Sequence, residues 1–140
     1  MRDSAVTVRA IRGATQVDVD EAWEIRRATR ELLAAVFEEN DLQPESVISI
    51  FFTATPDIVS DFPALAAHEY GLADVPMICA TEMNVPDVMP RVIRVLAHVI
   101  SDRPRSALRH PYLRGAAAIR PEAVLEKRKR SGNIGRNVTL

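Results

Sequence analysis

Residues Val75–Val99, with the sequence VPMICATEMNVPDVMPRVIRVLAHV, decide the fold of this chain. The stretch holds two short apolar runs, Val75–Ala80 and Val92–Val99, joined by a connector that contains prolines. Apolar runs of this length, bounded by turn-forming residues, predict two strands. The whole stretch carries side chains that are unusual in an apolar segment: Cys79, Glu82, Arg91 and Arg94.

The charged side chains of this stretch need a partner, because burial of an unpaired charge is costly. Glu82 stands at the end of the first predicted strand, and Arg94 lies inside the second. One explanation is that the two side chains pair with each other. The other is that they share an anionic ligand that also bears a hydroxyl group. The pattern of residues leaves both explanations open.

The composition is that of an ordinary globular protein. The chain has 140 residues, of which 47% are hydrophobic and 26% charged, and this balance predicts one domain with a proper core. A net charge of −1 argues against a protein that works mainly by coating nucleic acid. Cys79 is the only cysteine, which excludes an intramolecular disulfide. The N-terminus lacks the apolar core of a signal peptide and no apolar run could span a membrane, so we expect a cytoplasmic protein without a membrane partner.

Before the central stretch, the alternation in Ala5–Ile11 predicts a strand that ends at Arg12–Thr15. Asp18 is expected to cap a long helix, with Glu21 completing a capping box, and the helix should continue to about Asn40. Its buried face follows the helical period through Ile25, Thr29, Leu32 and Val36, with Trp23 and Phe37 at the edges. The wet side of the helix is expected to carry solvated charges, at Glu24, Arg26, Arg27, Arg30 and Glu31.

Further elements flank the central stretch. Val47–Thr55 is rich in β-branched and aromatic residues and predicts a buried strand. A short helix should follow, with Asp61 as its cap, Pro63 in its first turn and Gly71 at its end. Residues Arg109–Ile119 predict a last strand at an edge or a bulge, because Pro111 interrupts it.

This order of elements predicts an α+β fold, an α/β sandwich with a mixed sheet of about five strands and one long and one short helix. Two helices cannot cover both faces of such a sheet. Burial of the remaining face between subunits is the simplest remedy, and we therefore predict an oligomer.

Arginines recur at the ends of the predicted strands, at positions 12, 94 and 120, with Tyr112 between the last two. Guanidinium groups bind carboxylates through two parallel hydrogen bonds, so several around one cavity would suit a small polyanionic acid. Glu82 could accept a hydrogen bond from a ligand hydroxyl. The simpler readings are a solvated loop for Arg12, a core position for Phe62 and a small buried hydrophobe for Cys79. His68, His98 and His110 show no metal-ligand spacing, and we expect no metal.

Four blocks together resemble the monofunctional AroH-class chorismate mutases. They are VRAIRGATQVD near the N-terminus, FTATPDIVSDFPALAA, the VPMICATEMNVPDVMPRVIRVL block, and LRHPYLRGAAAIRP near the C-terminus. The resemblance covers about residues 7–123, which places a single domain at residues 1–123 and leaves 124–140 as a polar, flexible tail with the basic run Lys127–Arg130. It implies a pseudo-α/β-barrel homotrimer with active sites at the subunit interfaces. It also implies the cofactor-free rearrangement of chorismate to prephenate, on the route to phenylalanine and tyrosine.

The resemblance also implies roles for individual residues. Arg94 matches the arginine that donates to the breaking ether oxygen and to a substrate carboxylate, and Glu82 the carboxylate that accepts the ring hydroxyl, with Cys79 beside it. Arg12 and Tyr112 match the residues that hold the side-chain carboxylate of the substrate. Phe62 matches the aromatic wall that a neighbouring subunit lends to the site. Arg120 matches a late arginine near the mouth of the site.

The chain departs from the family pattern at Leu65 and His68, where some relatives carry basic residues, and at Asp87, where a small residue is expected. Less positive charge in the short helix would leave capture of the ring carboxylate to Arg120 and the tail. Three alternatives remain on the sequence alone. They are a trimeric YjgF/RidA-like enamine or imine deaminase, a non-catalytic trimer that binds a small acid, and a nucleic-acid binder that uses Lys127–Arg130.

Overall fold

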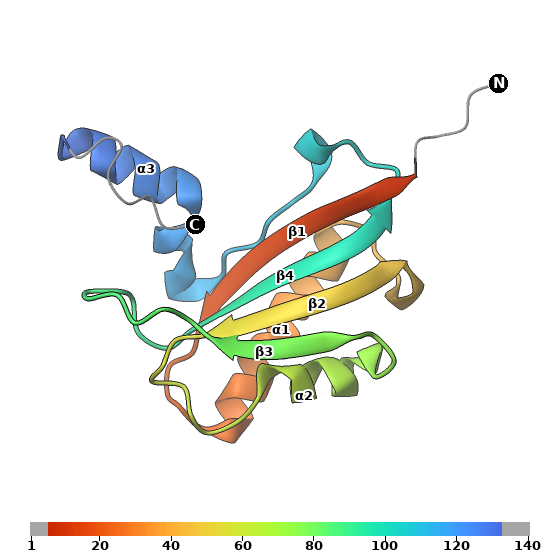
Figure 1. The fold of residues 1–140 in the computed structure, drawn as a ribbon, viewed down its shortest axis with the longest axis horizontal. Helices are drawn as coiled ribbons and strands as arrows, with labels where there is room; N and C mark the ends of the chain where they lie inside the picture. Colours follow the sequence, from red (N-terminus) through yellow and green to blue (C-terminus); the bar gives the residue numbers. More distant parts are fainter. Residues whose placement is uncertain (1–5, 133–140) are drawn as a thin grey trace.

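The structure is a computed structural model that describes residues 6–132. A mixed sheet of four strands forms its centre, in the order β1-β4-β2-β3 (Figure 1). The strands are β1 (Thr7–Gln16), β2 (Val47–Ala54), β3 (Met77–Thr81) and β4 (Val92–Ser101). β4 pairs antiparallel with both β1 and β2, whereas β2 and β3 run parallel. The expected α+β class is therefore confirmed, with one strand fewer than the sequence predicted.

The helices lie mainly on one side of the sheet. Helix α1 (Ala22–Glu39) crosses behind it in Figure 1, and α2 (Pro63–Ala67) lies along β3 and continues into the π-helical turn η2 (His68–Leu72). Helix α3 (Pro121–Arg130) projects away from the sheet. The short 3₁₀ helices are η1 (Pro44–Ser46), η3 (Arg105–Ala107) and η4 (Arg114–Ile119). None of the helices in residues 6–132 is long and apolar enough to cross a membrane.

The buried face of α1 is the one that the helical period predicts, since Ile25, Thr29, Leu32 and Val36 are all buried. Its N-terminus differs from the prediction. The N-cap is Glu21, without a side-chain cap, and the backbone N–H of Asp18 donates instead to Glu24. The cap of α2 is likewise Phe62 rather than Asp61, whose carboxylate accepts from the Phe62 N–H. Gly71, the predicted end of the short helix, breaks the helical conformation with a φ of 107°, although η2 extends to Leu72.

The alternation of β4 separates the two faces of the sheet. Its odd-numbered residues, Ile93 to Val99, are buried in the main core against the helices. Its even-numbered residues, Arg94 to Ile100, point to the other face. That second face carries the exposed apolar side chains of all four strands: Val8, Phe51, Ile78, Leu96 and Ile100.

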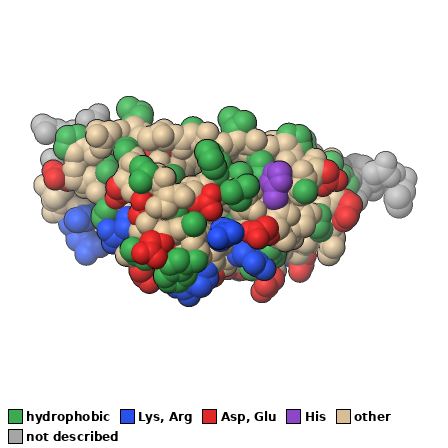
Figure 2. Space-filling model, turned by 90° about the horizontal axis from the view of Figure 1, so that it is seen from below, with side chains coloured by type: hydrophobic (Ala, Val, Ile, Leu, Met, Phe, Trp, Pro, Cys, Tyr) green, Lys and Arg blue, Asp and Glu red, His purple; other side chains and the backbone are tan. Residues whose placement is uncertain are grey.

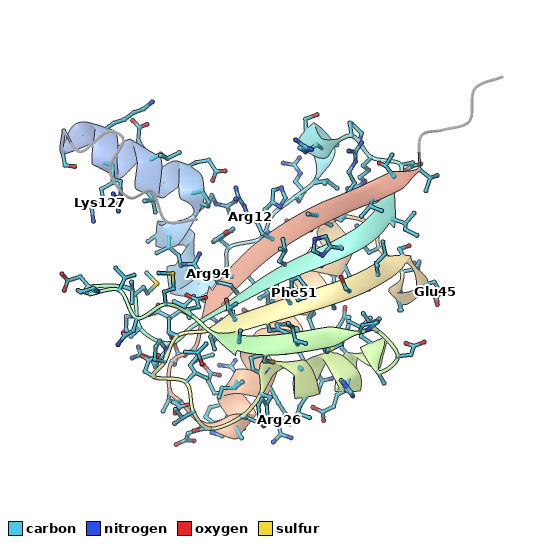
Figure 3. All side chains as sticks on the ribbon, in the orientation of Figure 1. Arg12, Arg26, Glu45, Phe51, Arg94 and Lys127 are labelled. Atoms are coloured by element: carbon cyan, nitrogen blue, oxygen red, sulfur yellow. The ribbon has the colours of Figure 1, made fainter. Side chains whose placement is uncertain are left out.

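We call this second surface the open face. Phe51 lies at its middle in Figure 3, and none of the described helices crosses it there. Seen from below in Figure 2, hydrophobic side chains project along the edge of the molecule that carries it, while most charged side chains lie on the opposite half. The sequence prediction that one sheet face lacks cover within a single chain is thus correct for residues 6–132.

The prediction of a last strand over Arg109–Ile119 is wrong. Only an isolated parallel bridge joins Tyr112 to Ala14, and η4 follows directly. Pro111 has no N–H to continue a ladder, and Arg114 turns the backbone with a φ of 53°. The segment still packs on one end of the open face, where Tyr112 and Ala116 form a small second core with Ala14 and Val92.

Strand β1 extends beyond its predicted end and includes Arg12–Thr15, because β4 pairs with it as far as Gln16. Gly13 is therefore a strand residue, and its role is to allow a close approach. A Cβ at this position would lie 2.7 Å from the backbone oxygen of Pro111. The same segment places Tyr112 over the end of β1. Of the predicted basic tail, residues 124–130 are helical, and residues 133–140 lie outside the described part.

Candidate active site

The charged residues of the central stretch form an ion pair. Arg94 Nε lies 3.0 Å from Glu82 Oε2, and both side chains are largely buried. Glu82 is held where β3 ends, because its N–H donates to the carbonyl of Ala54 at 2.9 Å. The side chain of Thr53 donates to the same Glu82 oxygen at 2.6 Å, from the β2 position that faces Arg94 in the register. Mutual pairing therefore accounts for the two charges.

Some hydrogen-bonding groups of this ion pair are nevertheless unused. Within residues 6–132, the other carboxylate oxygen of Glu82 and the terminal nitrogens of Arg94 have no hydrogen-bond partner. A guanidinium group has five N–H donors, and a carboxylate oxygen has two lone pairs. The pair can thus donate to an anion and accept from a hydroxyl at the same time. Both explanations given by the sequence are compatible with this geometry.

Tyr112 lies near three of the predicted arginines, because the charges of Arg12, Arg94 and Arg120 act on its hydroxyl. The guanidinium carbon of Arg120 lies 5.2 Å from the centroid of the Tyr112 ring. Burial raises the pKa of Tyr112, and the nearby charges of Arg12, Arg94 and Arg120 only partly oppose that rise. Tyr112 therefore keeps its O–H donor at neutral pH. Arg12 and Arg94 lie at the same end of the sheet in Figure 3.

His110 holds this cluster together, a role that the sequence did not indicate. Its Nδ1 accepts from the backbone N–H of Arg12 at 3.1 Å, and its carbonyl accepts from Arg120 at 3.0 Å. Burial and the charge of Arg12 lower the pKa of His110, which keeps the ring neutral and able to accept. Arg12 also lies 3.9 Å from Glu122, at the start of α3.

A buried carboxylate anchors the segment that leads to Arg120. Glu24 is fully buried and accepts from Arg114 at 3.0 Å and from Arg27 at 2.8 Å. Burial raises the pKa of Glu24, but the hydrogen bonds from Asp18, Arg27 and Arg114 outweigh it and hold the pKa below its ordinary value. The predicted wet side of α1 is therefore wrong at Glu24.

Arg91 stabilises the fold through hydrogen bonds of its side chain and its backbone. Its Nε donates to the carbonyl of Val17 at 3.0 Å, and its N–H donates to the carboxylate of Asp57. These bonds fix the end of the connector between β3 and β4. Within the described residues, no group of three or more His, Cys, Asp or Glu side chains could hold a metal ion.

Two predicted site residues lie elsewhere in the chain. Cys79 pairs in register with the buried Phe52 and packs on the helix side of β3, although only two residues separate it from Glu82. Burial raises the pKa of its thiol. Phe62 stands at the start of α2 with 65% of its side chain exposed. The single chain thus brings together Arg12, Glu82, Arg94, Tyr112 and Arg120, but neither Cys79 nor Phe62.

Comparison with known proteins identifies the family of this chain. The family model described as chorismate mutase type I matches residues 8–123. The chain is 47% identical to the chorismate mutase AroH of Thermus thermophilus, over 82% of this chain and 95% of the relative. It is 40% identical to that of Bacillus subtilis, over 86% and 95% respectively. A solved chorismate mutase from Clostridium thermocellum superposes with a TM-score of 0.78 at 40% identity and covers 79% of this chain and 98% of that one. The chain belongs to the type I chorismate mutase family.

Proposed function

We propose that this chain converts chorismate to prephenate. The observation that carries the proposal is the Glu82–Arg94 pair, which keeps an unused acceptor and unused donors and whose Arg94 lies near Tyr112, together with Arg12 and Arg120. Chorismate is a dicarboxylic acid with a ring hydroxyl and an ether bridge, so it needs cationic donors and one acceptor. This cluster supplies both kinds of group within one region.

The reaction is intramolecular, and its atoms balance without a co-reactant. The ether C–O bond breaks while a C–C bond forms, and no proton is gained or lost. Charge develops on the ether oxygen as that bond breaks, and the free donors of Arg94 can stabilise it. Glu82 accepts from the ring hydroxyl and so orients the ring. No covalent intermediate is required.

Binding of the substrate in its folded, reactive shape supplies the rest of the rate enhancement. In this proposal Arg12 and Tyr112 hold the side-chain carboxylate, and Arg120 lies near the mouth of the site. The bonds of His110 support this assignment, because they fix the backbone of Arg12 and the guanidinium group of Arg120 before the substrate arrives. A preorganised site avoids a reorganisation cost during the reaction.

We further propose a homotrimer, a pseudo-α/β barrel whose sheets line the interior, with each site shared between subunits. The apolar open face supports this, since a face with five exposed large side chains, Val8, Phe51, Ile78, Leu96 and Ile100, is suited to burial against another copy. The exposed Phe62 would then reach the site of the neighbouring subunit. We propose that the protein acts in the cytoplasm, in the synthesis of phenylalanine and tyrosine.

The first experiment is to mix the purified protein with chorismate and to follow the loss of ultraviolet absorbance while prephenate is identified as the product. We expect turnover far above the uncatalysed rate. A folded protein that binds chorismate without turnover would refute the catalytic proposal, and turnover of enamine acids alone would favour the deaminase reading. Sedimentation equilibrium tests the trimer separately.

A further inference from the structure

The Thr53 hydroxyl contacts the Glu82–Arg94 pair. Its hydroxyl donates to Glu82 Oε2 at 2.6 Å, and Arg94 Nε lies 3.0 Å from the same oxygen. Thr53 sits on β2, an inner strand of the sheet, directly opposite Arg94 in the register. Its β-branched side chain has few rotamers and so holds the hydroxyl in a fixed direction.

Both interactions of the Glu82 carboxylate fall on one oxygen. Oε2 accepts the hydrogen bond from Thr53 and is the oxygen nearest to the Arg94 guanidinium, which leaves Oε1 without a hydrogen-bond partner among the described residues. The closest contact of Arg94 is made by Nε, and we call this arrangement the one-point geometry. An arginine and a carboxylate otherwise favour a two-point contact, in which both oxygens and two nitrogens are consumed.

The terminal torsion of a glutamate side chain is soft, so the carboxylate of Glu82 can rotate about it, and little besides Thr53 opposes that rotation. Without the hydroxyl, the Glu82 carboxylate could turn until both oxygens face Arg94. That contact would remove the acceptor proposed for the ring hydroxyl and one of the donors proposed for the ether oxygen. The Thr53 hydroxyl therefore separates the two tasks of the pair.

We propose that Thr53 is a positioning residue of the active site, which keeps the Glu82–Arg94 pair in its one-point geometry and so presents Glu82 Oε1 to the ring hydroxyl of the substrate. This inference rests on the proposed function. It assigns Thr53 no contact with the substrate and no part in the bond changes.

The test compares Thr53→Val, which keeps the shape, Thr53→Ala, which covers a failure of the first to fold, and Thr53→Ser, which restores the donor. Ser49→Ala is the matched control, because it removes a hydroxyl from the same strand that contacts His98 and not Glu82. We expect kcat/KM to fall about 10- to 100-fold without the hydroxyl, the range for a lost hydrogen bond to a charged group. Thr53→Ser should recover most of that loss, and Ser49→Ala should retain wild-type turnover.

A second measurement distinguishes positioning from general damage. Calorimetry gives the Kd of prephenate and of an analogue in which hydrogen replaces the ring hydroxyl. The wild type should prefer prephenate by about tenfold, and the variants without the Thr53 hydroxyl should lose most of that preference. Damage elsewhere in the site would weaken both ligands equally and leave the preference unchanged.

The outcomes are separable. Loss of both kcat/KM and hydroxyl preference, with rescue by serine, supports the inference. Wild-type kcat/KM without the hydroxyl overturns it, and so does a loss of activity with an unchanged preference. Failure of the proposed function shows differently, as a wild-type protein that does not convert chorismate at all.

Discussion

Replacement of Arg94 is the perturbation that tests the proposed mechanism most directly. Arg94 contacts Glu82 through Nε, which leaves its terminal nitrogens for the substrate. Loss of one preorganised donor to a developing oxyanion costs about 3–4 kcal/mol, or roughly 10²–10³ in rate. We expect at least this loss of kcat/KM in Arg94→Ala, because the whole guanidinium group is removed.

Arg94→Lys should also fail, since an ammonium group cannot hold Glu82 and present further donors in the fixed geometry of a guanidinium. The assay is chorismate consumption at several substrate concentrations, which separates kcat from KM. Arg103→Ala is the matched control, because Arg103 is a similarly buried arginine whose ion pair, with Asp41, lies away from the site. Near-wild-type turnover in Arg94→Lys would refute the proposed role, and a loss in Arg103→Ala would point to general damage.

Three further predictions concern assembly and stability. Leu96→Glu places a charge on the open face and should shift the sedimenting species toward monomer with loss of activity; an unchanged trimer would contradict burial of that face. Gly13→Ala should lower the free energy of unfolding by about 1–3 kcal/mol in urea titration, because the new Cβ meets the rigid backbone oxygen of Pro111 at 2.7 Å. The lowered pKa of Glu24 means that its stabilisation is complete above its unfolded-state value of 4.5 and is lost as the pH falls through the folded-state value. Urea titrations from neutral to acidic pH should show this loss in the wild type and a smaller one in Glu24→Gln; equal acid sensitivity would contradict it.

The sequence predicted the elements whose signal lies within a few neighbouring residues. The buried face of α1 follows from the 3.6-residue period, and the strand β2 from its run of β-branched and aromatic residues. The prediction of the last strand was wrong for two reasons, one within the segment and one from a contact that is distant in sequence. Pro111 interrupts it, and the segment satisfies its backbone through contacts with β1 rather than through a full ladder.

Resemblance to a family supplied the candidate residues, and the tertiary structure decided which of them meet. The resemblance implied that Cys79 lies beside Glu82 in the site, yet alternation along β3 directs Cys79 to the core and away from Arg94. The helical period predicts a solvated Glu24, because it does not reveal that Arg114 reaches this buried carboxylate.

The sequence by itself thus determined the helix faces, most of the strands and the types of residue in the site. Only the tertiary structure decided that Thr53 opposes Arg94 and that His110 joins Arg12 to Arg120. The physical reason is range. Periodicity and turn chemistry act between neighbours in the chain, whereas strand register and side-chain hydrogen bonds join residues that are distant in sequence and that meet only when the sheet has formed.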